Sequence, residues 1–216
     1  LNTKEEIVRA FWELTYVPAK VYRTAVGGAH LLRLVKAGKV GENPRVVKWY
    51  LDWACQAGLD LPVIRGLAGK CWKWDIDWAA EYAAEGGHTD VLDLLASEFG
   101  AKIGGDCLIA AARWGQNDAM IDHLVEEYGV DPNGAAALHE AASRGRVRTV
   151  KHLVEKRNVD IHKRDWEGKT ALDLAEEEGM TECAAVLRGY GATNGEPVEE
   201  DWTESDEWET DDNSDA

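Results

Sequence analysis

The chain has 216 residues, of which 45% are apolar, and a formal net charge of −16. We expect a soluble protein with a sizeable core, because no apolar run approaches the about 18 residues of a membrane span and no signal-peptide pattern is present. The strong negative field of the C-terminal segment disfavours direct nucleic-acid binding. The composition is that expected of a soluble intracellular protein, cytoplasmic and/or nuclear. Since the sequence begins at Leu1 and not at methionine, we expect a processed form or a piece of a longer chain.

The first predicted element is an amphipathic helix over Glu5–Thr15. Pro18 interrupts it, and Gly27 and Gly28 mark the entry to the next helix. Residues 1–28 resemble none of the repeated segments described below. We interpret them as an N-terminal helical cap, with the second helix of an upstream repeat as the alternative.

Two apolar helices are predicted next, over Ala29–Gly38 and Arg45–Leu61, and we interpret them as the first and second helices of one repeated unit. The pattern is irregular from there to residue 78, where Pro62 and Gly66 interrupt branched apolar residues. Three tryptophans stand at roughly alternate positions at the end of this stretch, Trp72, Trp74 and Trp78. We expect their rings to fill the gap between two irregular repeats, and an aromatic ligand patch is the alternative.

Four similar segments follow, which cover residues 78–101, 107–131, 137–160 and 171–192. In the last three, a leucine stands seven residues before a glycine: Leu108 and Gly115, Leu138 and Gly145, Leu172 and Gly179. Each segment predicts a short Ala-rich helix, a glycine in left-handed conformation and a second apolar helix. Because one such unit buries too little surface to stand alone, we expect the copies to stack and share a core.

The final copy contains Asp165, Gly168, Thr170, Ala171, Leu172, Leu174, Ala175, Gly179, Gly191 and Ala192. These residues, and the Leu138–His139 pair of the preceding copy, resemble the ankyrin-repeat family, clearly over residues 106–192 and more weakly upstream. The resemblance implies an all-α solenoid of about four to five helix-turn-helix ankyrin repeats over residues 29–192. It also implies that His139 bonds the neighbouring turn.

Residues 193–216 form an acidic segment that is predicted to be a disordered tail. From Glu196 onward it has eleven acidic residues and no basic one, so it carries −11 of the total charge of −16. Such a segment cannot bury enough surface to fold. It either keeps the protein in solution or attracts a basic partner, and Trp202 and Trp208 favour a binding role.

Residues that could carry catalysis or bind metal are scattered. The four cysteines, Cys55, Cys71, Cys107 and Cys183, have no paired spacing and are interpreted as reduced structural thiols. His123 and His152 lie at equivalent places of successive copies, which indicates repeat equivalence and not a ligand pair. No nucleotide, phosphate or zinc motif is present. We therefore expect no enzymatic activity and no cofactor.

The resemblance also implies a concave surface made by the two positions before each first-helix glycine and by the turn tips. Carried over residue by residue, the candidate partner-binding residues are Glu85, Arg113, Trp114, Ser143, Arg144, Trp166, Glu167, Lys169, Glu177 and Glu178. Two exposed tryptophans, Trp114 and Trp166, favour binding over a solvated face.

The expected function is that of a monomeric adaptor or scaffold that holds a protein partner in this concave surface. A second possibility is a chaperone for a basic client, such as a ribosomal protein or histone, which would use the acidic tail. A third is a subunit whose repeats position a catalytic partner.

Overall fold

The computed structural model describes residues 44–114, 117–134 and 136–195. Within these ranges the chain forms ten α-helices and no strand. The helices are α4 (Pro44–Ala57), α5 (Leu61–Ala68), α6 (Lys73–Gly86), α7 (Thr89–Phe99), α8 (Gly105–Trp114), α9 (Asp118–Glu126), α10 (Ala137–Ser143), α11 (Val147–Arg157), α12 (Ala171–Glu177) and α13 (Thr181–Gly189). The predictions for residues 1–43, Gly115, Trp202 and Trp208 lie outside the described residues.

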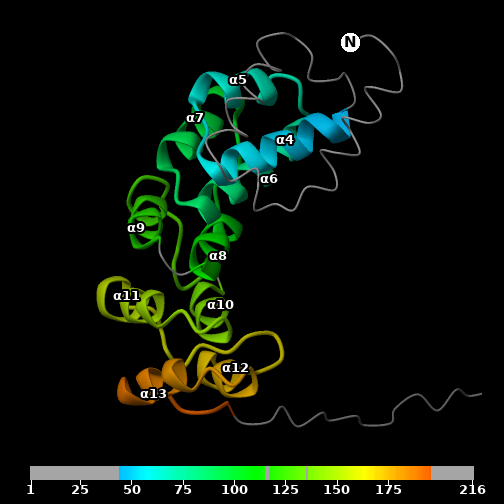
Figure 1. The fold of residues 1–216 in the computed structure, drawn as a ribbon. Helices are drawn as coiled ribbons and strands as arrows, with labels where there is room; N and C mark the ends of the chain where they lie inside the picture. The colour runs from blue at the N-terminus through cyan, green and yellow to red at the C-terminus, as the bar shows by residue number, and fades with distance from the viewer. Residues whose placement is uncertain (1–43, 115–116, 135, 196–216) are drawn as a thin grey trace, which may run out of the picture.

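The described helices form two rows that stack into a curved solenoid. Helices α4, α6, α8, α10 and α12 pack against one another in succession, and each is followed by the second helix of its pair. Figure 1 shows the first helices along the inner side of the curve and the second helices along the outer side. The all-α repeat architecture predicted from the sequence is therefore confirmed, with five helix pairs in the described part of the chain.

The pairing of the first described repeat corrects one sequence assignment. Arg45–Leu61 was predicted to be a second helix, but α4 packs against α6 in the row of first helices. Its partner is α5, which occupies the stretch that looked irregular and carries Pro62 in its first turn. Proline there costs no hydrogen bond, because the first N–H groups of a helix have no partner inside the helix.

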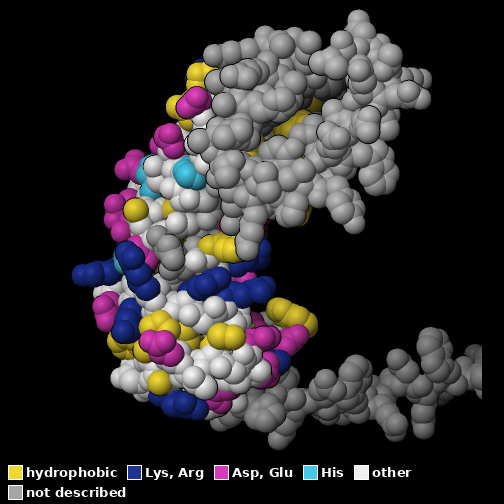
Figure 2. All heavy atoms as spheres, viewed as in Figure 1, with side chains coloured by type: hydrophobic (Ala, Val, Ile, Leu, Met, Phe, Trp, Pro, Cys, Tyr) yellow, Lys and Arg dark blue, Asp and Glu magenta, His cyan; other side chains and the backbone are white. Residues whose placement is uncertain are grey.

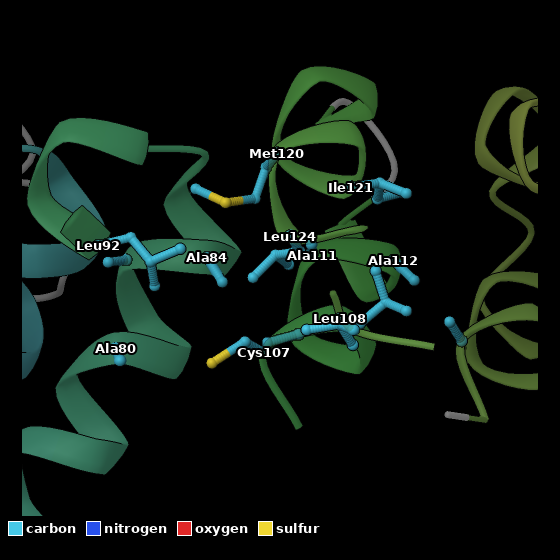
Figure 3. Packing of buried hydrophobic residues seen from close by; sticks show 14 of the residues in the cluster. Ala80, Ala84, Leu92, Cys107, Leu108, Ala111, Ala112, Met120, Ile121 and Leu124 are labelled. Atoms are coloured by element: carbon cyan, nitrogen blue, oxygen red, sulfur yellow. The ribbon is translucent and has the colours of Figure 1, made fainter. Parts of the chain in front are cut away.

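Small residues allow the first helices to approach closely. An alanine stands four residues before the glycine of every copy, and all five are fully buried: Ala54, Ala83, Ala111, Ala141 and Ala175. Figure 3 shows the core in the middle of the stack, where Met120 and Leu124 point toward Leu92 of the preceding repeat and Ile121 points toward the next one. The core is therefore continuous from repeat to repeat, as expected for a solenoid.

The predicted left-handed glycine turn is confirmed. Gly145 and Gly179 have φ of +68° and +69°, and Gly58 and Gly87 repeat the same turn upstream, at +62° and +77°. At the end of α11, Asn158 takes the left-handed position with φ of +50°. Asparagine tolerates this conformation better than other residues with a side chain.

The expectation that Trp72, Trp74 and Trp78 fill a gap is wrong. Their exposed fractions are 64%, 70% and 55%. The buried face of α6 is instead formed by Ile76 and four alanines at helical spacing, which leaves the tryptophans on the other side. The irregular pattern that suggested a gap is α5 and the start of α6.

The last described residues belong to the final repeat. The sequence analysis counted residues 193–195 with the tail, but Asn194 donates a hydrogen bond to Asp173 at 2.7 Å and the backbone N–H of Gly195 donates one to the same carboxylate at 2.7 Å. Burial opposes the ionised form of Asp173, whereas these donors and Thr170 favour it, and the net effect lowers its pKa. The chain is thereby fixed to α12 as far as Gly195.

Candidate functional site

The concave groove is defined here as the inner face of α4, α6, α8, α10 and α12. The residues at the two positions before each glycine turn are Gln56 and Ala57, Glu85 and Gly86, Arg113 and Trp114, Ser143 and Arg144, and Glu177 and Glu178. Figure 2 shows Lys and Arg side chains gathered around the middle of the stack. Between Ala137 and Arg164 the sequence has eight Lys and Arg against three Asp and Glu, so this repeat is basic.

At the N-terminal end of the described groove lies a depression of 320 Å³. It is lined by Trp53, Gln56 and Ala57 of α4, Glu85 and Gly86 of α6, and Trp114 of α8. Trp114 is 46% exposed. The depression therefore spans three repeats and contains two of the residues predicted from the sequence, Glu85 and Trp114.

In the middle of the groove, one carboxylate joins two guanidinium groups. Arg113 and Arg144 both donate to Oε1 of Glu140, at 2.8 and 3.2 Å. Ser143 donates its hydroxyl hydrogen to the backbone oxygen of the same residue at 3.1 Å. The structure thus brings Arg113, Ser143 and Arg144 together around Glu140, with one negative charge for two positive ones.

The C-terminal end of the groove is formed by the turn before α12. Lys169 pairs with Glu167 at 3.1 Å and with Glu177 at 2.9 Å. The indole of Trp166, at the turn tip, is 90% exposed. Glu178 is exposed. At this end of the chain Lys169 thus joins Glu167 and Glu177, while Trp166 and Glu178 are exposed.

His139 holds the backbone of the turn before α12. Its Nε2 lies 3.1 Å from the backbone oxygen of Lys163 and 3.3 Å from that of Lys169, so a hydrogen on Nε2 donates to the turn. This confirms the bond implied by the resemblance. His139 is buried and therefore stabilises the groove without offering a ligand to a partner.

The remaining paired histidines lie on the outer row. His123 lies 2.7 Å from Asp93 of the preceding repeat, and His152 lies 2.6 Å from Asp122. The same contact made one repeat apart confirms repeat equivalence. In the described residues, no group of three or more His, Cys, Asp and Glu side chains is arranged to hold a metal ion.

The cysteines are free, as predicted, and Cys55, Cys107 and Cys183 are buried. Burial raises the pKa of Cys107 to about 11 and that of Cys183 to about 11, so both are thiols at neutral pH. Cys71 is partly buried, and burial likewise raises its pKa, to about 11. Neutral thiols are poor nucleophiles, which fits a structural role.

Sequence reasoning missed the α4 side of the depression. Gln56 and Ala57 precede Gly58 by the same two positions that were used elsewhere, but Gly58 was not recognised as a first-helix glycine. The signal was present, because Leu51 stands seven residues and Ala54 four residues before it. Both are fully buried, like their counterparts in the other repeats.

The comparisons with known proteins agree with this architecture. Residues 107–196 match the family model for ankyrin repeats, in three copies. This part of the chain consists of ankyrin repeats, and the helix pairs upstream of it continue the same two rows. No match was found among curated proteins.

Ankyrin repeats indicate a protein–protein interaction module, so the expected partner class is a protein. No helix among the described residues is long and apolar enough to span a membrane.

Proposed function

We propose that this protein is a non-enzymatic adaptor that holds a segment of a partner protein in the concave groove. The observation that carries the proposal is the depression at Trp114, where two tryptophans and a carboxylate from three successive repeats surround a hollow on the inner face. An indole with 46% of its surface in water costs free energy unless a partner covers it. Tryptophan is also among the residues that contribute most to binding at interfaces.

The test is quantitative capture of proteins from native extract with the wild-type chain and two variants. Trp114→Ala should weaken retention of specific partners by about 1–3 kcal/mol, as expected for an exposed contact residue. Arg148→Ala is the matched control, because Arg148 is exposed on the outer row, where it pairs with Asp118 at 2.6 Å. Retention that is equal in all three proteins would contradict binding at this end of the groove. A melting temperature lowered by Trp114→Ala with unchanged retention would show that the ring serves packing.

The second candidate is a chaperone for a basic client, and the observation that favours it is that the 21 residues after Gly195 include eleven acidic residues and no basic one. Its binding would depend on the acidic segment and on ionic strength, because exposed charges are screened by salt. Binding of basic ribosomal-protein and histone peptides should then fall between about 50 and 300 mM salt and should be lost when residues 196–216 are removed. Equal binding with and without this segment at low salt would exclude the chaperone and leave the groove.

A further inference from the structure

The depression exists because side-chain size changes abruptly along one row of the groove. Immediately before the glycine turn, the first two described repeats have Ala57 and Gly86, and the third has Trp114. All three residues line the depression. On the α4 side, Trp53 lies one helical turn before Ala57 and also lines the hollow.

A side chain cannot be added at Gly86 without moving the backbone. A Cβ on Gly86 would lie 2.3 Å from the backbone oxygen of Gln56 and 2.6 Å from the ring of His88. That ring is itself held in place, because its Nε2 lies 3.2 Å from the same Gln56 oxygen. Close packing of α4 against α6 therefore requires glycine at position 86.

The residues that line the depression can attract a cation in two ways. The faces of the Trp53 and Trp114 indoles attract positive charge through their quadrupoles. Glu85 supplies a carboxylate beside them, which Gln56 orients through a hydrogen bond from its side-chain amide to Oε1. The same two helices already contain one such contact, since the ammonium group of Lys48 lies 5.8 Å from the ring centroid of Trp78.

Helices α4 and α6 also carry a net negative charge, which favours a bound cation. Together α4 and α6 have five Asp and Glu against three Lys and Arg. Burial raises the pKa of Glu81, and the neighbouring Asp106 raises it further. Burial also raises the pKa of Asp52, although Lys48 bonds it at 2.6 Å. In both cases burial outweighs the nearby positive charge, which comes from Lys48 at Asp52 and from Arg113 and Lys48 at Glu81.

We infer that the depression between Trp53 and Trp114 binds the guanidinium group of an arginine presented by the partner, with its charge against Glu85. A guanidinium plane stacks on indole faces and donates two parallel hydrogen bonds to one carboxylate, which an ammonium group does not do. This inference rests on the proposed function, to which it adds the chemistry of the bound segment: the partner is basic at the point where it meets the first three described repeats.

The test uses the full chain and short capped peptides of Gly and Ser around one central residue. The central residue is arginine, citrulline, which has the same shape without the charge, or glutamate. Binding is followed by the indole N–H signals of the protein in two-dimensional NMR, at about 150 mM salt so that distant charges are screened. The signals of interest are assigned with Trp53→Phe and Trp114→Ala.

The arginine peptide should shift the Trp53 and Trp114 signals with a Kd near 1 mM, and the citrulline peptide should bind about tenfold more weakly. Glu85→Gln should weaken binding of the arginine peptide by about five- to tenfold. The rest of the spectrum should remain that of the folded protein. Glu127→Gln, an exposed carboxylate at the end of α9, is the control and should leave the affinity unchanged.

Three results would overturn the inference. Equal binding of the arginine and citrulline peptides, with both dependent on Trp114, would leave groove binding in place but remove the cation. Equal binding of the arginine peptide to the wild type and to Glu85→Gln would remove the role of the carboxylate. No shift with any peptide would show that the hollow does not take an arginine side chain, and the capture experiment with Trp114→Ala would then decide the proposed function separately.

Discussion

Gly145 and Gly179 hold the same place in successive repeats but have different surroundings. Both have a positive φ, which a side chain with a branched Cβ adopts only with strain. A Cβ on Gly145 would lie 2.7 Å from the thioether sulfur of Met180, whereas a Cβ on Gly179 would meet nothing within 4 Å. Backbone strain is therefore common to both positions, and a steric contact is specific to Gly145.

Gly145→Val should lower the free energy of unfolding by at least ~1 kcal/mol, because valine cannot adopt this turn cheaply. Gly179→Val should show the backbone strain alone. Its loss of unfolding free energy should be only somewhat smaller than that of Gly145→Val, because the flexible side chain of Met180 can move away from a Cβ at position 145. Urea denaturation of the two variants and the wild type measures both effects. An unchanged midpoint for Gly145→Val would contradict the role of the left-handed turn.

At the residue scale, electrostatic coupling is clearest at Asp122 of α9. It accepts hydrogen bonds from His152 at 2.6 Å and from Nε of Arg157 at 2.8 Å, both on α11. Burial opposes the charged form, but these two partners outweigh it and lower the pKa of the Asp122 carboxyl. Since its pKa is lower in the folded than in the unfolded chain, the carboxylate stabilises the fold above the unfolded value of about 3.9 and loses this effect as the pH falls through the folded value.

Asp122→Asn should therefore destabilise the protein at pH 5, and the difference from the wild type should vanish at acidic pH below the folded pKa of Asp122. The loss should be below about 1 kcal/mol, because the carboxylate is partly in water and the ion pairs are screened. Denaturant melts of both proteins between about pH 2 and pH 5 provide the measurement, a window below the usual His titration. A difference that stays constant over this range would assign the effect to geometry and not to charge.

At the scale of the elements, the spacing of a few residues determined how much could be predicted. The Leu-to-Gly spacing identified the last three helix pairs, and the resemblance correctly assigned a structural bond to His139. The first described pair was misassigned because Gly58 is followed by Pro62, which suggested a loop, whereas α5 begins at Leu61. The spacing of Leu51, Ala54 and Gly58 matches that of the first helices in the other repeats and indicated the correct row.

The depression could not be predicted for a related reason. Position in the repeat predicts Glu85 and Trp114 as groove residues, and both line the depression. A hollow depends on how far side chains from three different helices project, which follows from helix packing. The requirement for glycine at position 86 likewise becomes clear only when the backbone of Gln56 is seen beside it.

Gly86→Ala should destabilise the packing of α4 on α6 by about 1–3 kcal/mol, since the added methyl group would force backbone atoms apart. Gly104→Ala is the matched control, because a Cβ there would meet nothing within 4 Å and its φ is not in the left-handed region. Its effect should stay within about 0.5 kcal/mol. Chemical denaturation of both variants tests the difference, and equal midpoints would show that α4 and α6 are not in such close contact.

At the scale of the whole molecule, charge is distributed unevenly along the chain. The basic repeat that begins with α10 is the fourth of the five described helix pairs, and a segment with eleven acidic residues follows the last repeat. The described contacts fix the chain as far as Gly195, where its backbone N–H bonds Asp173.

Removing residues 196–216 should leave the melting temperature nearly unchanged, because the composition of this segment cannot form a core and exposed charge pairs contribute little. Differential scanning calorimetry of the full and shortened chains at about 150 mM salt measures this. A melting temperature lowered by several degrees would show that the acidic segment packs on the repeats.

The stacking of each repeat on its immediate neighbours also has a mechanical consequence. The principal helix contacts join adjacent repeats, and side-chain bonds between repeats, such as those from α11 to Asp122, reach back by one repeat. A force applied at the two ends therefore acts equally on every interface between repeats. The weakest interface separates first, because distant interfaces do not support it. Stretched in this way, the protein should lengthen in successive steps of about 30 residues, or about 100 Å of extended chain each. Before the first step it should act as a spring that is softer than any single interface, because the extensions of the interfaces add.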